Sequence, residues 1–242
     1  SEAQNAANTV CIREYFNEGG AEIRLLKTGS DYSCHLMKTY KIHLIRHGMT
    51  EANSDGRYIG RTDLPLSPEG LAALLQLKEK YQYPGGVRFF TSPLSRCRQT
   101  LEVLYPGCQP ETVEGLAECD FGEWEGRSIR DLKNDPRFIR WVERADNGIP
   151  GGEDSEDFRA RVCGAFEGIV NAIIHSGHTE AVVCTHGGVI TMLMQLYGLP
   201  RLDPKDCLTA PGQGFTLRVT PSIWMNEPLA EALCIIPWEK EQ

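Results

Sequence analysis

Lys41-Ile42-His43-Leu44-Ile45-Arg46-His47-Gly48 is a short apolar run that ends in two basic residues and a glycine. Ala181-Val182-Val183-Cys184-Thr185-His186-Gly187-Gly188 repeats this arrangement, with a histidine and glycines directly after the apolar residues. A brief apolar run bounded by turn-forming residues is typical of a strand buried on both faces. Such strands occur mainly in parallel sheets, because helices on both faces are needed to bury them.

Strands and helices alternate along the chain around these two stretches. Apolar spacing and capping residues predict helices over residues 67–81, 94–104, 154–176 and 189–197, and a helix over 131–145 that Pro136 interrupts. Strands are expected at residues 42–45, 87–91, 181–185 and 215–219. The alternation predicts an α/β fold, a three-layer α/β/α sandwich around a mainly parallel central sheet.

Composition excludes several classes of protein. The 242 residues include 25 Lys and Arg against 33 Asp and Glu, a net charge of −8 that disfavours binding to nucleic acid or to an anionic membrane. We find no apolar stretch of membrane-spanning length and no signal-peptide pattern. None of the nine cysteines belongs to a C-x-x-C pair, so we expect reduced thiols in a cytoplasmic protein.

The first 36 residues differ from the remainder. Strand-like runs at 9–16 and 21–26 flank Asn17-Glu18-Gly19-Gly20, which predicts a hairpin. The first methionine, Met37, directly precedes the first strong strand. We therefore expect residues 1–36 to be an N-terminal extension, and residues 37–242 to form a single domain.

Basic residues gather at the predicted carboxyl ends of strands, where ligands bind in this class of fold. His47 and His186 each follow a strand, Arg46 precedes the first histidine, and Asn53 lies on the same loop. One such histidine alone is more often a structural, hydrogen-bonded residue, but two beside an arginine favour a ligand site. Arg96 is expected in the first turn of a helix, where backbone amides already attract anions. Together these residues predict a phosphate site.

Motifs of other phosphate chemistries are missing from the sequence. There is no P-loop, no cysteine followed six positions later by arginine, no Asp-x-Asp pair and no G-x-S-x-G elbow. Histidine remains as the nucleophile, since a neutral imidazole can form a covalent phosphoryl intermediate.

Five blocks in order resemble the histidine phosphatase superfamily, branch 1, the phosphoglycerate-mutase-like proteins. They are residues 46–53 (RHGMTEAN), 61–70 (RTDLPLSPEG), 92–100 (SPLSRCRQT), 118–126 (ECDFGEWEG) and 185–188 (THGG). The resemblance implies the family's fold and a histidine phosphatase domain over residues 37–242. It implies no cofactor and no metal.

The same resemblance implies roles for individual residues. His47 would be the nucleophile, and Arg46, Arg96 and His186 would bind the phosphoryl oxygens with Asn53 in support. Gly60 and Gly187 would add backbone contacts to the phosphate. Glu118 would be the proton donor, although the residues themselves do not separate it from Glu123 or Glu125.

Departures from the family's mutases favour hydrolysis. Gly126 leads to Arg127-Ser128, and only about 25 residues separate it from Gly151-Gly152-Glu153, which leaves no room for a long basic insertion. Residues 60–63, 121–126 and 150–153 resemble α-ribazole-5′-phosphate phosphatases. We therefore expect a phosphoric monoester hydrolase for a small phosphorylated metabolite, with α-ribazole 5′-phosphate as the named candidate. Its partner would be a small-molecule phosphate monoester, and we expect it to bind neither nucleic acid nor a membrane. Whether the chain forms a homodimer is left open by the sequence.

Three alternatives remain at this point. The chain could be a phosphoglycerate mutase, or a non-catalytic regulatory module that binds phosphate. A metalloprotein would use His43 with His47, or His175 with His178; we instead interpret His43 as a strand residue and the other pair as residues of a helix end and turn.

Overall fold

The computed structural model describes the backbone of residues 11–17, 20–26, 38–86, 88–143 and 148–240. The chain forms two compact units, residues 1–38 and 39–242. In the first unit, β1 (Cys11–Asn17) and β2 (Gly20–Leu26) pair antiparallel, with Cys11 opposite Leu26. Two residues of the expected turn between them, 18 and 19, lie outside the described residues.

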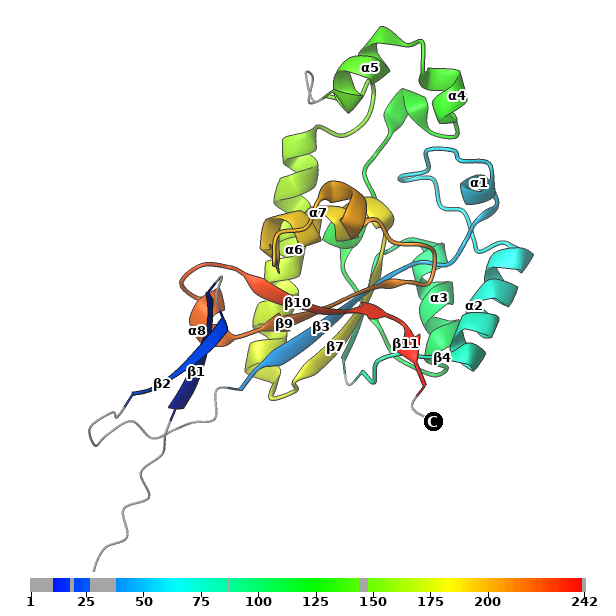
Figure 1. Cartoon of the computed structure of the whole chain (residues 1–242). Coiled ribbons are helices and arrows are strands. Elements are labelled where there is room, and N and C mark those ends of the chain that lie inside the picture. Colours follow the sequence, from blue (N-terminus) through cyan, green and yellow to red (C-terminus); the bar gives the residue numbers. More distant parts are fainter. Residues whose placement is uncertain (1–10, 18–19, 27–37, 87, 144–147, 241–242) are drawn as a thin grey trace, which may run out of the picture. The chain divides into compact units, whose positions relative to one another are not determined.

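The second unit is built on a seven-stranded sheet (Figure 1). Its spatial order is β6 (Glu111–Thr112), β5 (Arg88–Thr91), β7 (Glu180–Thr185), β3 (Tyr40–Arg46), β9 (Gly214–Val219), β10 (Ala230–Ile236) and β8 (Gly198–Leu199). Neighbours from β6 to β3 are parallel, whereas β9 is antiparallel to both β3 and β10. The predicted α/β fold with a mainly parallel sheet is confirmed.

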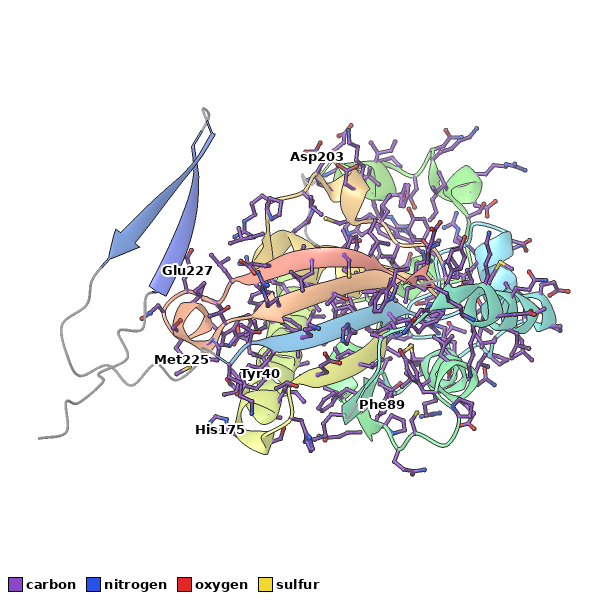
Figure 2. All side chains as sticks on the ribbon, turned by 60° about the horizontal axis from the view of Figure 1, so that its bottom comes forward. Tyr40, Phe89, His175, Asp203, Met225 and Glu227 are labelled. Atoms are coloured by element: carbon purple, nitrogen blue, oxygen red, sulfur yellow. The ribbon has the colours of Figure 1, made fainter. Side chains whose placement is uncertain are left out.

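Helices cover both faces of this sheet (Figure 1). Alternate residues of β3 point to opposite faces, so Ile42 and Leu44 join a core with α6 (Ser155–Ser176) and α7 (Gly187–Tyr197). Ile45 joins the opposite core, which includes Leu74 of α2 (Pro68–Lys80) and Leu101 of α3 (Ser95–Leu104). Figure 2 shows strands of this sheet side by side, with their side chains.

Capping residues set the helix boundaries. The Ser67 side chain accepts a hydrogen bond from the Gly70 amide at 3.0 Å, which fixes the start of α2, with Pro68 in its first turn. Asp154 caps α6, and Gly177 ends that helix with a φ of 78°. The expected interruption at Pro136 is present, because α4 (Ile129–Leu132) ends before it and α5 (Pro136–Val142) begins there.

Short elements complete the described chain. They are α1 (Glu51–Ser54), α8 (Pro221–Trp224), three 3₁₀ helices η1 (Glu114–Leu116), η2 (Gly122–Trp124) and η3 (Pro204–Cys207), and the paired strands β4 (Tyr81–Gln82) and β11 (Trp238–Glu239). No helix among the described residues is long and apolar enough to cross a membrane.

The histidines of the metalloprotein alternative take separate positions. His43 is buried in β3, and its Nδ1 lies 3.0 Å from the Thr216 hydroxyl of β9. His175 lies in the last turn of α6, where its Nδ1 is 2.7 Å from the Asn171 carbonyl. Each of these two histidines thus has a hydrogen-bond partner of its own, away from His47 and His186.

Candidate active site

Three strand ends meet at one edge of the sheet. β3 and β7 pair in parallel register with Arg46 opposite Thr185, and the His47 amide donates to the Thr185 carbonyl at 2.9 Å. The rings of His47 and His186 consequently lie 5.1 Å apart between centroids, at an angle of 61°. The Ser92 amide, after β5, donates to the Cys184 carbonyl at 3.0 Å and brings the start of α3 to the same edge.

His47 is held as a neutral imidazole. It is 5% exposed, and its Nδ1 lies 2.7 Å from the Gly48 carbonyl, which can only accept, so Nδ1 carries the ring proton. Burial, together with the positive charge of Arg96 and Arg46, lowers the pKa of His47 to about 3. The lone pair on Nε2 is therefore available at neutral pH, as a nucleophile requires.

Two arginines are fixed by backbone carbonyls and keep unused donors. Arg46 Nη1 donates to the Thr209 carbonyl, while Arg96 donates to the carbonyls of Thr62 at 2.9 Å and Gly60 at 2.8 Å. The buried Nε–H groups of both arginines have no hydrogen-bond partner among the described residues. Buried charged donors without partners are costly, so this geometry favours an anion between them.

His186 is completely buried between two partners. Its Nδ1 lies 3.3 Å from Arg96 Nη2 and its Nε2 lies 2.7 Å from the Ser92 hydroxyl. Because the guanidinium can only donate, Nδ1 accepts and the ring proton sits on Nε2. A bond from Nδ1 of His186 to a phosphoryl oxygen thus requires both the loss of the Arg96 contact and a proton on Nδ1. The part of Ser92 in holding this ring was missed by the sequence interpretation.

Glu118 lies near both arginines and is 9% exposed. Its Oε1 accepts from the Cys119 amide at 2.9 Å, and its Oε2 accepts from the Gly188 amide at 3.0 Å. Burial raises the pKa of Glu118 against the opposing effect of these bonds and of the arginines. A Cβ atom at position 188 would lie 2.5 Å from Oε1, which explains the glycine there.

The two other candidate carboxylates are placed differently. Glu123 is exposed on η2 and pairs with Arg137 at 3.0 Å. Glu125 binds the amide of Gly60 at 2.8 Å and that of Arg61 at 3.0 Å. The structure therefore brings Glu118, and neither of the alternatives, to the buried carboxylate position beside the arginines.

Asn53 and Gly187 shape the surroundings of His47 and Arg46, respectively. The Asn53 side-chain oxygen accepts from the Thr50 amide at 3.1 Å and from its hydroxyl at 3.0 Å, which ties down the loop after His47. A Cβ atom at Gly187 would lie 3.3 Å from Arg46 Cζ, so a glycine leaves that guanidinium its place. Arg98 is exposed and donates to the Pro93 carbonyl, as expected of a surface residue.

Comparison with known proteins fits this arrangement. The sequence profile of the histidine phosphatase superfamily (branch 1) matches residues 42–213. The chain belongs to this superfamily. It is 29% identical over 180 residues to the probable phosphoglycerate mutase GpmB of Salmonella paratyphi C (strain RKS4594), an alignment that covers 69% of this chain and 81% of the relative.

Solved structures support the same assignment. TTHB049 from Thermus thermophilus is 32% identical with a TM-score of 0.61, covering 81% of this chain and 98% of the other. A phosphoglycerate mutase from the same organism is also 32% identical, with a TM-score of 0.61 over 83% and 99% of the two chains. A candidate α-ribazole-5′-P phosphatase from Escherichia coli str. K-12 substr. MG1655 is 23% identical with a TM-score of 0.63, covering 83% and 96%, and shares the fold.

Within this member of the histidine phosphatase superfamily, Glu125 braces the loop that holds Arg96. Its carboxylate accepts from the amides of Gly60 and Arg61 and, at 2.7 Å, from the Thr62 hydroxyl. The carbonyls of Gly60 and Thr62 are the acceptors of Arg96. The Gly60 amide is occupied by Glu125 and its carbonyl supports Arg96, and the contact of Gly60 with phosphate stays a prediction.

Replacing Glu125 with glutamine should lower the kcat/KM of any phosphate ester by about 10- to 100-fold, because a misplaced Arg96 stabilises transition-state charge less well. Glutamine keeps the size of the side chain but offers one acceptor oxygen instead of two. Steady-state kinetics on Glu125→Gln, beside Glu123→Gln as an exposed control on the same block, measure the effect. Equal kinetics for the two variants would contradict the bracing role.

Proposed function

We propose that the chain is a phosphomonoesterase that transfers the phosphoryl group of a small metabolite first to His47 and then to water. The observation that carries this proposal is a buried, neutral His47 beside two arginines whose Nε–H donors lack partners among the described residues. An anion at this point would satisfy the donors and lie within reach of the imidazole. The two guanidiniums would supply the positive charge that phosphoryl transfer requires, without a metal.

The first step forms a covalent intermediate. Nε2 of His47 attacks phosphorus, and the bond between phosphorus and the alcohol oxygen breaks. Glu118, whose pKa is raised by burial, gives its proton to that oxygen, so the alcohol leaves neutral. The products are phospho-His47, a free alcohol and the Glu118 carboxylate.

The second step returns the enzyme to its starting state. The Glu118 carboxylate takes a proton from water while the water oxygen attacks phosphorus, and the bond from phosphorus to Nε2 breaks. Inorganic phosphate leaves, and Glu118 is protonated again. Arg46 and Arg96 are already fixed by carbonyls, which limits the reorganisation needed to stabilise the oxygens in either step.

Hydrolysis is favoured over mutase chemistry by the segment after the acid block. Residues 127–143 there form the turn, α4 and α5, and the chain returns to Gly151 without a long basic insertion. A mutase must hold a bisphosphate while it turns over, which needs additional cations. The second candidate function is nevertheless a phosphoglycerate mutase, because the Salmonella relative and one Thermus structure carry that name.

α-Ribazole 5′-phosphate is the named substrate candidate within this proposal. Its support is the likeness of residues 60–63, 121–126 and 150–153 to that group, together with the fold shared with the Escherichia coli protein. Glu125 and Gly60, which belong to these segments, hold Arg96 in place. The likeness therefore concerns the phosphoryl site more than the part of the protein that would contact the alcohol.

Phosphate release from p-nitrophenyl phosphate should persist in excess chelator, because protein cations occupy the roles that a metal would have. The parallel assay follows conversion of 3-phosphoglycerate to 2-phosphoglycerate with bisphosphoglycerate added. Release of phosphate without isomerisation supports the proposal. Isomerisation that outpaces hydrolysis, or activity that disappears in chelator, would contradict it.

A further inference from the structure

A pocket of about 470 Å³ opens directly from the phosphoryl site. One end is lined by Arg46, Glu118 and the first residues of α7, and the other by Thr191, Met192, Gln195 and Leu208. This volume is within the range of pockets that hold small ligands. The pocket begins beside Glu118, which in the proposed reaction protonates the departing oxygen.

The geometry of α7 aligns this pocket with the departing group. Gly188, Thr191, Met192 and Gln195 are spaced as i, i+3, i+4 and i+7, so they share one face of the helix. The amide of Gly188 holds the Glu118 carboxylate at the start of that face. A substrate with its phosphoryl group on His47 and its ester oxygen at Glu118 has room for its alcohol portion along this face.

Leu208, at the end of the pocket away from Glu118, is linked to the phosphoryl site through the backbone. Leu208 is 70% exposed and immediately precedes Thr209, whose carbonyl accepts from Arg46. The Thr191 hydroxyl donates to the Cys207 carbonyl at 3.3 Å, which fixes the loop against α7. Leu208 is thus an exposed apolar side chain on an anchored loop, well placed for contact with a ligand.

Apart from Arg46 and Glu118, the described side chains that line the pocket are uncharged. Among the described residues that line the pocket, Arg46 and Glu118 are the charged ones, and both belong to the phosphoryl site. Lys205 on the neighbouring η3 is largely exposed and pairs with Asp203 at 3.6 Å. A carboxylate or second phosphate in the far part of the pocket would find no cation among the residues that the structure shows lining it.

We infer that this pocket selects phosphate monoesters whose alcohol portion is uncharged, with an apolar face for Met192 and Leu208 and a polar group for the Gln195 carboxamide. The inference rests on the proposed hydrolysis and names the substrate class of that same site. It disfavours phosphoglycerates, whose carboxylate would have to lie in the neutral part of the pocket.

A pair of esters matched in size and differing in charge tests the inference. 4-Carbamoylphenyl phosphate and 4-carboxyphenyl phosphate have the same shape, but the second has an additional negative charge. The wild-type chain should have a kcat/KM for the carbamoyl ester about tenfold or more above that for the carboxy ester. Gln195→Lys should raise the relative kcat/KM of the carboxy ester by about tenfold, because it supplies the missing cation.

Two further variants make the result specific. Leu208→Lys places a positive charge at an exposed position on the side of the pocket opposite Gln195. It should also raise the relative kcat/KM of the carboxy ester, and it provides the test if Gln195→Lys does not fold. Gln76→Lys makes the same exchange on the exposed face of α2 and should leave the ratio of the two esters at its wild-type value.

The outcomes separate this inference from the proposed function. Hydrolysis of both esters at equal kcat/KM, or lysine variants that keep the wild-type ratio, would overturn the neutral-pocket inference and leave phosphatase activity standing. Failure of the wild-type chain to hydrolyse these esters and p-nitrophenyl phosphate would overturn the proposed function itself.

Discussion

The His47→Asn variant should hydrolyse p-nitrophenyl phosphate with a kcat lowered by about 10⁴-fold or more, as expected when a covalent nucleophile is removed. Asparagine keeps a polar side chain of moderate size at a buried position, but its amide nitrogen has no lone pair to offer phosphorus. The one ring contact of His47 with a backbone acceptor uses Nδ1, so Nε2 is the atom that the substitution removes from the reaction. Steady-state release of p-nitrophenol measures the loss.

The matched control is His175→Asn. This residue is exposed in the last turn of α6, where its imidazole meets a helix carbonyl, so its replacement should leave kcat unchanged. Retention of more than about a tenth of the wild-type kcat in His47→Asn would mean that phosphorus is attacked by another group.

The second large effect is expected for Glu118→Gln, and its size should depend on the leaving group. An alkyl phosphate needs a proton on its departing oxygen, so its kcat should fall by about 10²- to 10⁴-fold. p-Nitrophenolate leaves without a proton, so its release in the first turnover should change little. Since glutamine cannot deprotonate water, the second step slows, and the variant should release p-nitrophenol in a burst followed by a slow phase.

The pH dependence of the same variant gives an independent measurement. Glu118 must be protonated to act as the donor, and burial raises its pKa, so activity is present below that pKa and is lost as pH rises through it. The pKa of His47, about 3, adds no change at neutral pH. The basic limb of the wild-type profile for an alkyl phosphate should be missing in Glu118→Gln and kept in Glu123→Gln. A basic limb that survives in Glu118→Gln would assign the proton to another group.

Much of the site could be predicted because its histidines directly follow the apolar runs that also predict the strands. His47 and His186 follow buried strands, and parallel strands end at one edge, so their proximity follows from the alternation of strands and helices. The residues that hold this site together were not predictable in the same way. Glu125 acts on Gly60, 65 positions away, and Ser92 acts on His186, 94 positions away, and such contacts leave no periodic pattern in the sequence.

The sheet shows a similar division. β3, β5 and β7 are short, strongly apolar strands, and each was predicted from its own residues. β10 was not predicted, and its apolar residues Leu233, Cys234 and Ile235 are all exposed around a bulge, unlike those of a regular buried strand. Its antiparallel neighbour β9 was predicted as a strand, but its direction depends on pairing with β3, which the local sequence does not specify.

The net charge of −8 is compatible with an anionic substrate because the positive charge is local. Arg46 and Arg96 are anchored at the sheet edge, while most acidic residues lie at exposed positions. A phosphate monoester small enough to enter therefore meets a cationic pocket, whereas a polymeric phosphate meets a surface of the same sign.

The most direct measurement of the central claim is isolation of the phosphoenzyme. Wild-type and Glu118→Gln chains are mixed with a ³²P-labelled aryl phosphate, quenched rapidly in base, digested and analysed by mass spectrometry at alkaline pH. We expect a base-stable, acid-labile phosphoryl group on His47 that accumulates further in Glu118→Gln. A chain that turns over substrate without any phosphohistidine, or with the label on another residue, would contradict the account.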